Sequence, residues 1–146
     1  MGRVFFNTRK NIENLTADHT VLASDSGKTF IVLPAATTDI TLPTPALAGE
    51  GWNCRIILQA DDGFGGDELM DQKVNIDMTS GTANVGQIRG ADGDTGDQAV
   101  SGDDFINCTV GASPGDMFEF MTDGVRWFVH GYVFDASECP FGTATA

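Results

Sequence analysis

Side chains that suit catalysis are few in this sequence, and they are scattered along it. The two histidines, His19 and His130, each fall at an ordinary alternating position of a predicted strand, and neither begins a His-Glu-x-x-His motif. The Gly-Lys-Thr run at 27–29 matches the end of a P-loop signature, but Leu22 stands where that signature requires its first glycine. Acidic residues are so numerous that no pair stands out as a general acid and base. The sequence therefore predicts a protein that is not an enzyme and uses no cofactor.

Two acidic, glycine-rich stretches, 61–72 and 90–103, hold the densest groups of carboxylates. In the second stretch Asp92, Asp94 and Asp97 lie close together, and hard oxygen ligands at such spacing suit Ca²⁺. The spacing and the closing glutamate of an EF-hand are absent, and Gly and Asp also favour turns. We expect no resident metal ion and a solvated acidic loop, with these three aspartates as the candidate ligands if calcium binds.

The charge balance restricts the classes of partner. The chain has 146 residues, with 21 Asp and Glu against 8 Lys and Arg, which gives a formal net charge of −13. Binding to phosphate groups needs a basic surface, so this charge argues against nucleic acid as a partner. It argues equally against an anionic membrane surface.

The basic residues are concentrated at the N-terminus. Arg3, Arg9 and Lys10 all precede the first acidic residue, Glu13, and the same segment contains an apolar run at 4–6. The segment is therefore either a frayed, solvated terminus or an arm that becomes ordered on an acidic neighbour. No signal peptide is expected, because the apolar run is too short.

The three cysteines, Cys54, Cys108 and Cys139, do not make a closed set of disulfides, and no Cys-x-x-Cys pair occurs. Cys54 and Cys108 fall inside predicted strands, where a free cysteine behaves as a small buried hydrophobic residue. The sequence predicts free thiols and a protein made in a reducing, intracellular compartment.

Short apolar runs separated by Gly, Pro and Asp predict an all-β fold. The expected strands are 19–23, 28–33, 39–42, 53–59, 74–79, 85–89 and 104–110, followed by a hairpin over 117–133. No window of helical length shows an apolar stripe. We predict a single antiparallel β-sandwich or jelly-roll-like barrel over 19–134, with an extended N-terminal arm over 1–18 and a tail over 135–146.

The hairpin is predicted from the Asp-Gly pair at 123–124, which favours a two-residue type I′ turn. That turn places Thr122 opposite Val125. It thereby determines which residues of the two strands point to the same face of the sheet. The expected core face consists of Phe118, Phe120, Val125, Trp127 and Val129. The opposite face consists of Met117, Glu119, Met121, Arg126, Phe128 and His130. Because this second face is too apolar for plain solvent, we expect it to contact another protein.

Three motifs resemble small β-domains of tailed-bacteriophage virion proteins. They are the Ser-Gly-Lys turn at 26–28, the Ile-Thr-Leu-Pro strand end at 40–43, and the terminal Asp-Gly-x-x-Trp hairpin at 123–127. Such domains include head decoration (cement) proteins and the ends of some tail and head fibres. The resemblance covers about two thirds of the chain, since the middle, 60–103, matches no such domain.

The resemblance implies a non-enzymatic capsid decoration protein that forms a homotrimer and bridges capsomers on the outside of the phage head. Its partners are then the major capsid protein and itself, and it is assembled onto the virion in the host cytoplasm. The expected capsid contacts are Arg3, Phe5, Phe6, Arg9 and Lys10. The expected oligomer interface consists of Met121, Arg126, Phe128 and His130. The alternative is a receptor- or glycan-binding module of a tail or head fibre, with the acidic loops as its recognition surface.

Overall fold

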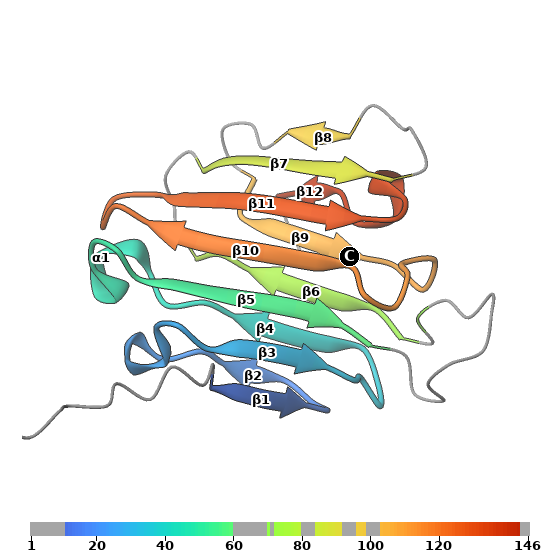
Figure 1. Cartoon of the computed structure of the whole chain (residues 1–146), viewed down its shortest axis with the longest axis horizontal. Helices are drawn as coiled ribbons and strands as arrows, with labels where there is room; N and C mark the ends of the chain where they lie inside the picture. The colour runs from blue at the N-terminus through green and yellow to red at the C-terminus, as the bar shows by residue number, and fades with distance from the viewer. Residues whose placement is uncertain are drawn as a thin grey trace, which may run out of the picture.

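Two β-sheets pack face to face in the computed structural model, which describes residues 11–59, 70, 72–79, 84–91, 96–98 and 103–143 (Figure 1). The larger sheet contains, in order across it, β1 (Ile12–Leu15), β3 (Thr29–Val32), β5 (Asn53–Leu58), β10 (Met117–Thr122), β11 (Trp127–Val133), β7 (Val85–Gly90) and β8 (Asp97–Gln98). The smaller sheet contains β12 (Phe141–Gly142), β9 (Phe105–Cys108), β6 (Val74–Asp77), β4 (Thr38–Thr41) and β2 (His19–Thr20). The predicted β-sandwich is confirmed.

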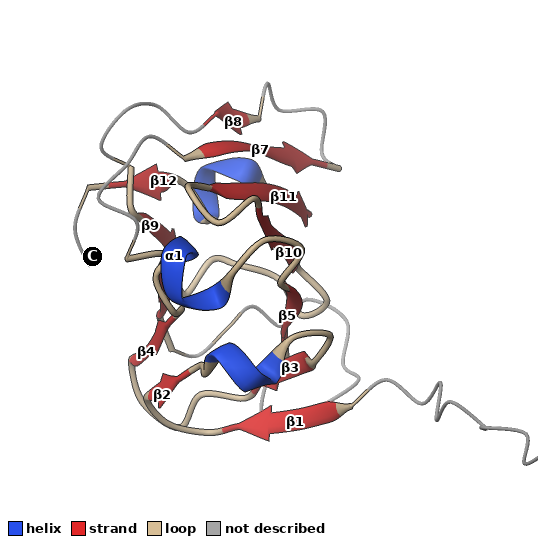
Figure 2. Cartoon of the chain, turned by 90° about the vertical axis from the view of Figure 1, so that its left-hand side faces the viewer, coloured by secondary structure: helices blue, strands red, loops and turns tan. Residues whose placement is uncertain are grey.

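Helical structure in the described ranges is limited to three short elements: α1 (Pro45–Ala48), η1 (Ala23–Asp25) and η2 (Ala136–Glu138). No helix there is long and apolar enough to cross a membrane. Figure 2 shows the two sheets as separate layers, with α1 at one end of the sandwich. Thr44 caps α1, because its hydroxyl accepts the N–H of Leu47 at 3.3 Å.

The sheets are mixed, whereas the sequence suggested purely antiparallel pairing. From β1 to β6 the chain alternates between the two sheets, so the strands that become neighbours within one sheet run in the same direction. β1, β3 and β5 are parallel in the larger sheet, and β2, β4 and β6 are parallel in the smaller one. Antiparallel pairing joins β5 to β10 and β10 to β11, at the centre of the larger sheet.

The core lies between the sheets and includes the aromatic residues predicted from the hairpin. Phe118, Phe120, Trp127 and Val129 are all buried there. The Trp127 indole N–H donates to the backbone carbonyl of Met78, on the opposite sheet, at 2.7 Å. This bond satisfies a polar group that burial would otherwise leave unpaired.

The hairpin turn differs from the prediction. Thr122 pairs with Trp127, so β10 and β11 are joined by a four-residue loop over 123–126 rather than by a two-residue turn. The Asp123 carboxylate accepts two backbone N–H groups of this loop, at 2.8 and 2.9 Å, and the Thr122 hydroxyl donates to a carbonyl at its end. Val125, predicted to be in the core, is therefore exposed. The register shifts by two residues, which leaves the faces of both strands unchanged.

Both ends of the folded part extend beyond the predicted boundaries. Ile12–Leu15, inside the predicted arm, is a strand that pairs with β3. The predicted tail contains η2 and β12, and Cys139 within it is fully buried. Residues 1–10, which include all five predicted capsid contacts, lie outside the described residues.

Candidate binding surface on the larger sheet

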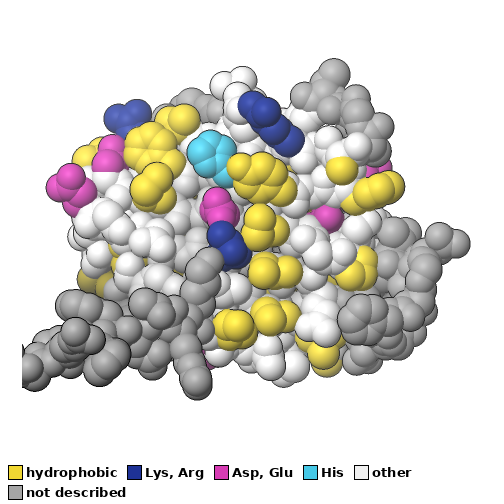
Figure 3. Space-filling model, in the orientation of Figure 1, with side chains coloured by type: hydrophobic (Ala, Val, Ile, Leu, Met, Phe, Trp, Pro, Cys, Tyr) yellow, Lys and Arg dark blue, Asp and Glu magenta, His cyan; other side chains and the backbone are white. Residues whose placement is uncertain are grey.

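The face of the larger sheet that points away from the core is referred to below as the outer face. Side chains gather on it in three rows that cross the strands, because the strand register aligns alternate residues. In Figure 3, hydrophobic side chains lie over β3, β5, β10 and β11, around a neighbouring basic and acidic pair.

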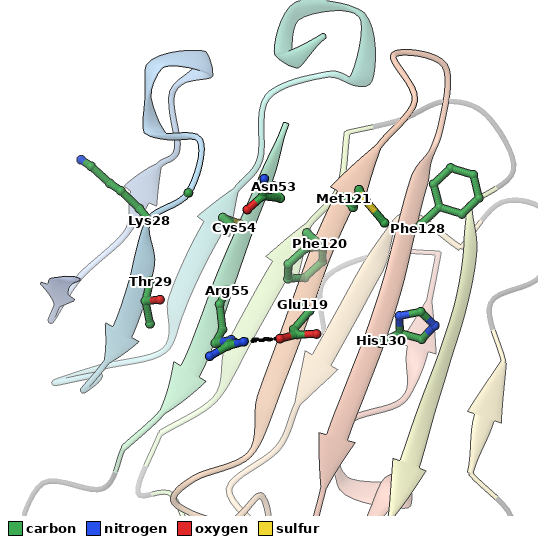
Figure 4. Close-up of a pocket in the computed structure, with 11 residues that line it drawn as sticks. Lys28, Thr29, Asn53, Cys54, Arg55, Glu119, Phe120, Met121, Phe128 and His130 are labelled. Carbon is green, nitrogen blue, oxygen red and sulfur yellow. Dashed lines mark hydrogen bonds and ion pairs between the residues drawn. The ribbon is translucent and has the colours of Figure 1, made fainter. Parts of the chain in front are cut away.

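The central row is polar and contains Thr29, Arg55, Glu119, His130 and Gln87, in order from β3 to β7. Arg55 donates to the Glu119 carboxylate from Nε, at 3.1 Å, and from a terminal guanidinium nitrogen (Figure 4). The side chains of this pair keep 33% and 40% of their surface exposed, so water screens the pair in the isolated chain.

Two largely apolar rows flank the central one. The first, the apolar row, contains Ile31, Ile57, Met117 and Tyr132 and ends at Arg89. The second, the hairpin row, contains Asn53, Met121, Phe128 and Val85. Tyr132 and Met121 keep 53% and 52% of their surface exposed. An exposed, contiguous apolar surface with a polar centre is typical of a site that contacts another protein.

One depression on this face has a volume of about 250 Å³ and is open to solvent (Figure 4). Its lining includes Thr29, Arg55, Glu119 and His130 of the central row, together with Met121 and Phe128. Binding sites for small molecules are usually concave and enclose about 300–1,000 Å³. This depression is therefore smaller than a typical small-molecule site, and the exposed apolar rows on either side of it suit a protein partner.

The structure brings together three of the four residues predicted for the oligomer interface. Met121, Phe128 and His130 all line the depression. Arg126 lies instead in the hairpin loop, where its Nε is 3.9 Å from an Asp123 carboxylate oxygen. The apolar row was not singled out in the sequence, although Ile57 alternates with buried residues of β5 and is only half-buried.

Asp97 has a structural role in the folded chain. One of its carboxylate oxygens accepts the backbone N–H of Phe141 at 2.7 Å, and the other accepts the N–H of Gln98 at 2.8 Å. Asp97 thereby ties the edge of the larger sheet to β12. The other two candidate calcium ligands, Asp92 and Asp94, lie outside the described residues. Within the described ranges, no group of three His, Cys, Asp or Glu side chains is arranged to hold a metal ion.

A Gly-x-Ser-x-Gly spacing occurs at 111–115, between β9 and β10. In hydrolases the serine of this motif sits on a turn that leads from a strand into a helix. Here the segment leads into a strand, and the backbone N–H of Ser113 donates to Asp116 at 2.9 Å. The segment therefore serves as a turn that a buried aspartate holds in place.

Comparisons with known proteins identify no relative: no protein-family model matches this sequence, and no curated protein matches it either.

Proposed function

We propose that this protein is a structural binding protein, a decoration protein of a tailed-phage head, which associates with copies of itself through the outer face. The observation that supports this most strongly is the combination of exposed Tyr132, Met121 and half-buried Phe128 on one flat sheet. Covering such a surface removes apolar area from water, which stabilises the complex by about 25 cal/mol for each Å² that is buried. The rigid sheet fixes these side chains before contact, which lowers the entropic cost of association.

The charges on the outer face are largely balanced. Arg55 pairs with Glu119, and Lys28 pairs with Glu13 and Asp25, while Arg89 lies at the end of the apolar row. The chain as a whole has a net charge of −13, so like surfaces of two copies repel each other. The outer face, whose charges are largely balanced, is therefore the surface at which two copies can approach each other with less repulsion. We expect the copies to close into a ring of three, as the resemblance to decoration proteins implies.

Attachment to the capsid is assigned to the N-terminal arm. The expectation rests on the basic and apolar residues within 1–10 and on the resemblance to decoration proteins. The arm must end before Ile12, since Ile12–Leu15 is already part of the larger sheet. A truncation that removes residues 1–10 therefore leaves every described strand intact.

The test is to add purified protein to expanded heads and to count the bound copies by cryo-electron microscopy. The full chain is expected to occupy repeated sites on the head, in clusters of three. The truncated chain is expected to stay folded and to bind few copies. Tyr132→Glu, which places a carboxylate on the apolar row, is expected to reduce occupancy.

Leu47→Glu is the matched control, because Leu47 is 68% exposed on α1 and lies outside the three rows. It is expected to bind as the full chain does. Unchanged occupancy after truncation would show that the arm is not the capsid contact. A signal confined to fibre tips would instead favour the receptor-binding alternative.

A further inference from the structure

Two of the three cysteines lie opposite each other where the antiparallel pairing of β9 with β12 continues beyond the start of β12. β12 pairs with β9 so that Phe141 is opposite Ile106, and continuing this register by two residues places Cys139 opposite Cys108. Backbone hydrogen bonds flank the pair on both sides. Asn107 N–H donates to the Pro140 carbonyl at 3.0 Å, and the N–H of residue 109 donates to the carbonyl of residue 138 at 2.8 Å.

These bonds make Cys108 and Cys139 a non-hydrogen-bonded pair, the position at which antiparallel strands approach most closely. Residues in such a pair have Cα atoms about 4.5 Å apart and side chains on the same face. A disulfide requires a Cα separation of roughly 4.4–6.8 Å, so the backbone already meets the requirement. The two thiols are also within hydrogen-bonding contact of each other.

We propose that Cys108 and Cys139 are a redox-sensitive pair that closes into a cross-strand disulfide when the protein leaves a reducing compartment. The disulfide ties the C-terminal segment 135–143 to β9. This inference is independent of the proposed function, because it concerns a single chain. Cys54 has no part in it, since it lies in β5 on the other sheet.

A buried carboxylate lies beside the pair. The Cys139 thiol donates to Asp116 at 4.0 Å, and the same carboxylate accepts the backbone N–H groups of Ser113 and Phe134 at 2.9 and 2.8 Å. Asp116 thus fixes the position of the Cys139 thiol in the closed, reduced pair. Burial raises the pKa of the Cys108 thiol, and this keeps the closed, reduced pair unreactive.

Oxidation therefore requires the C-terminal segment to open. β12 has only two residues, and Asp97 holds it through the N–H of Phe141. Because this pairing is so short, little free energy is needed to separate the segment from β9. Such local opening exposes both thiols together. Cys54 is instead the second residue of β5, a six-residue strand that lies between β3 and β10.

The oxidant is a small disulfide such as oxidised glutathione. One cysteine thiolate attacks it, forms a mixed disulfide and releases one small thiolate, which takes up the proton that the cysteine lost. The second cysteine thiolate then attacks the protein sulfur of the mixed disulfide. The cross-strand S–S bond forms, the mixed S–S bond breaks, and a second small thiol leaves with the remaining proton. Two protein thiols are oxidised and one small disulfide is reduced to two thiols.

The first experiment equilibrates the full chain with glutathione buffers of increasing oxidised fraction, blocks the remaining thiols and digests the protein with trypsin. Cleavage after Arg89 and Arg126 separates the Cys108 and Cys139 peptides, while Cys54 falls in the peptide that ends at Arg55. We expect one linked species that joins 90–126 to 127–146, lighter by about 2 Da than its two reduced peptides together. Free Cys108 and Cys139 at the fully oxidised end of the series would overturn the proposal, and so would a link through Cys54.

The second experiment measures the melting temperature of the oxidised and reduced forms. The disulfide closes the loop that runs from Cys108 to Cys139. Closing this loop is expected to raise the melting temperature by roughly 10 °C. Cys54→Ala is expected to keep this shift, and Cys139→Ala is expected to abolish it. A melting temperature that is unchanged or lower after oxidation of the full chain would contradict a stabilising link, whether or not the variants fold.

Discussion

Replacing Glu119 by glutamine tests whether the outer face is covered in the assembled protein. In the isolated chain the Arg55 and Glu119 side chains keep 33% and 40% of their surface exposed, and pairs of this kind contribute about 0.2–1 kcal/mol to stability. Glu119→Gln is therefore expected to lower the free energy of unfolding by less than about 1 kcal/mol. Urea unfolding at high dilution, where the chain is monomeric, measures this value.

Association is expected to respond far more strongly. When a second copy covers the face, Glu119→Gln leaves the Arg55 charge buried without its carboxylate, which costs about 2–5 kcal/mol. Each 1.4 kcal/mol corresponds to about a tenfold change in affinity, so the dissociation constant is expected to rise at least about 30-fold. Sedimentation equilibrium over a concentration series measures the change.

A double variant provides the control. Arg55→Met combined with Glu119→Met removes both charges and leaves apolar side chains of similar length, so no charge is buried alone. Association is expected to recover to within about tenfold of that of the unchanged chain. If Glu119→Gln alone leaves the dissociation constant unchanged, the outer face is not the self-association surface.

Three further predictions concern the sandwich that supports this face. Trp127→Phe removes the indole donor to the Met78 carbonyl and leaves a cavity, and it is expected to lower the free energy of unfolding in urea by about 3 kcal/mol. Gly131→Ala places a Cβ 2.8 Å from Ile88 Cγ1 and is expected to cost about 1–3 kcal/mol in the same assay, since β7 and β11 must separate slightly. Burial raises the pKa of Asp116 above 3.8 despite two backbone N–H donors, so its contribution to stability is fully present below pH 3.8 and is lost as the pH rises through the folded-state value. The stability of the unchanged chain relative to Asp116→Asn is therefore expected to fall as the pH rises above 3.8, and a difference that stays constant or grows would refute this assignment.

Strand positions were predictable from the sequence because most strands here have one buried face. The alternation of Cys54, Ile56 and Leu58 with more exposed residues gives the bounds of β5 almost to the residue. Strand direction was not predictable, because alternation is the same in parallel and antiparallel pairs. The crossing of the chain between sheets, which makes β1, β3 and β5 parallel, depends on contacts distant in sequence.

The faces of the residues within the two hairpin strands were predicted correctly, but the turn was not, and Val125 and Arg126 lie in the loop instead. The Asp-Gly pair favours a type I′ turn, but the Asp123 side chain accepts N–H groups further along and stabilises a longer loop. The apolar row was missed for a related reason. Ile31 lies in a run that is apolar at every position, so the sequence does not show which of its residues face outward.

The native mass of the protein in solution tests the central claim most directly. The chain has a mass of 15.5 kDa, and at micromolar concentration we expect the native mass to be three times that value. Tyr132→Glu is expected to return the mass to that of a single chain, while Leu47→Glu is expected to leave it tripled. A full-length protein that stays at the mass of one chain across the whole concentration range would contradict self-association through the outer face.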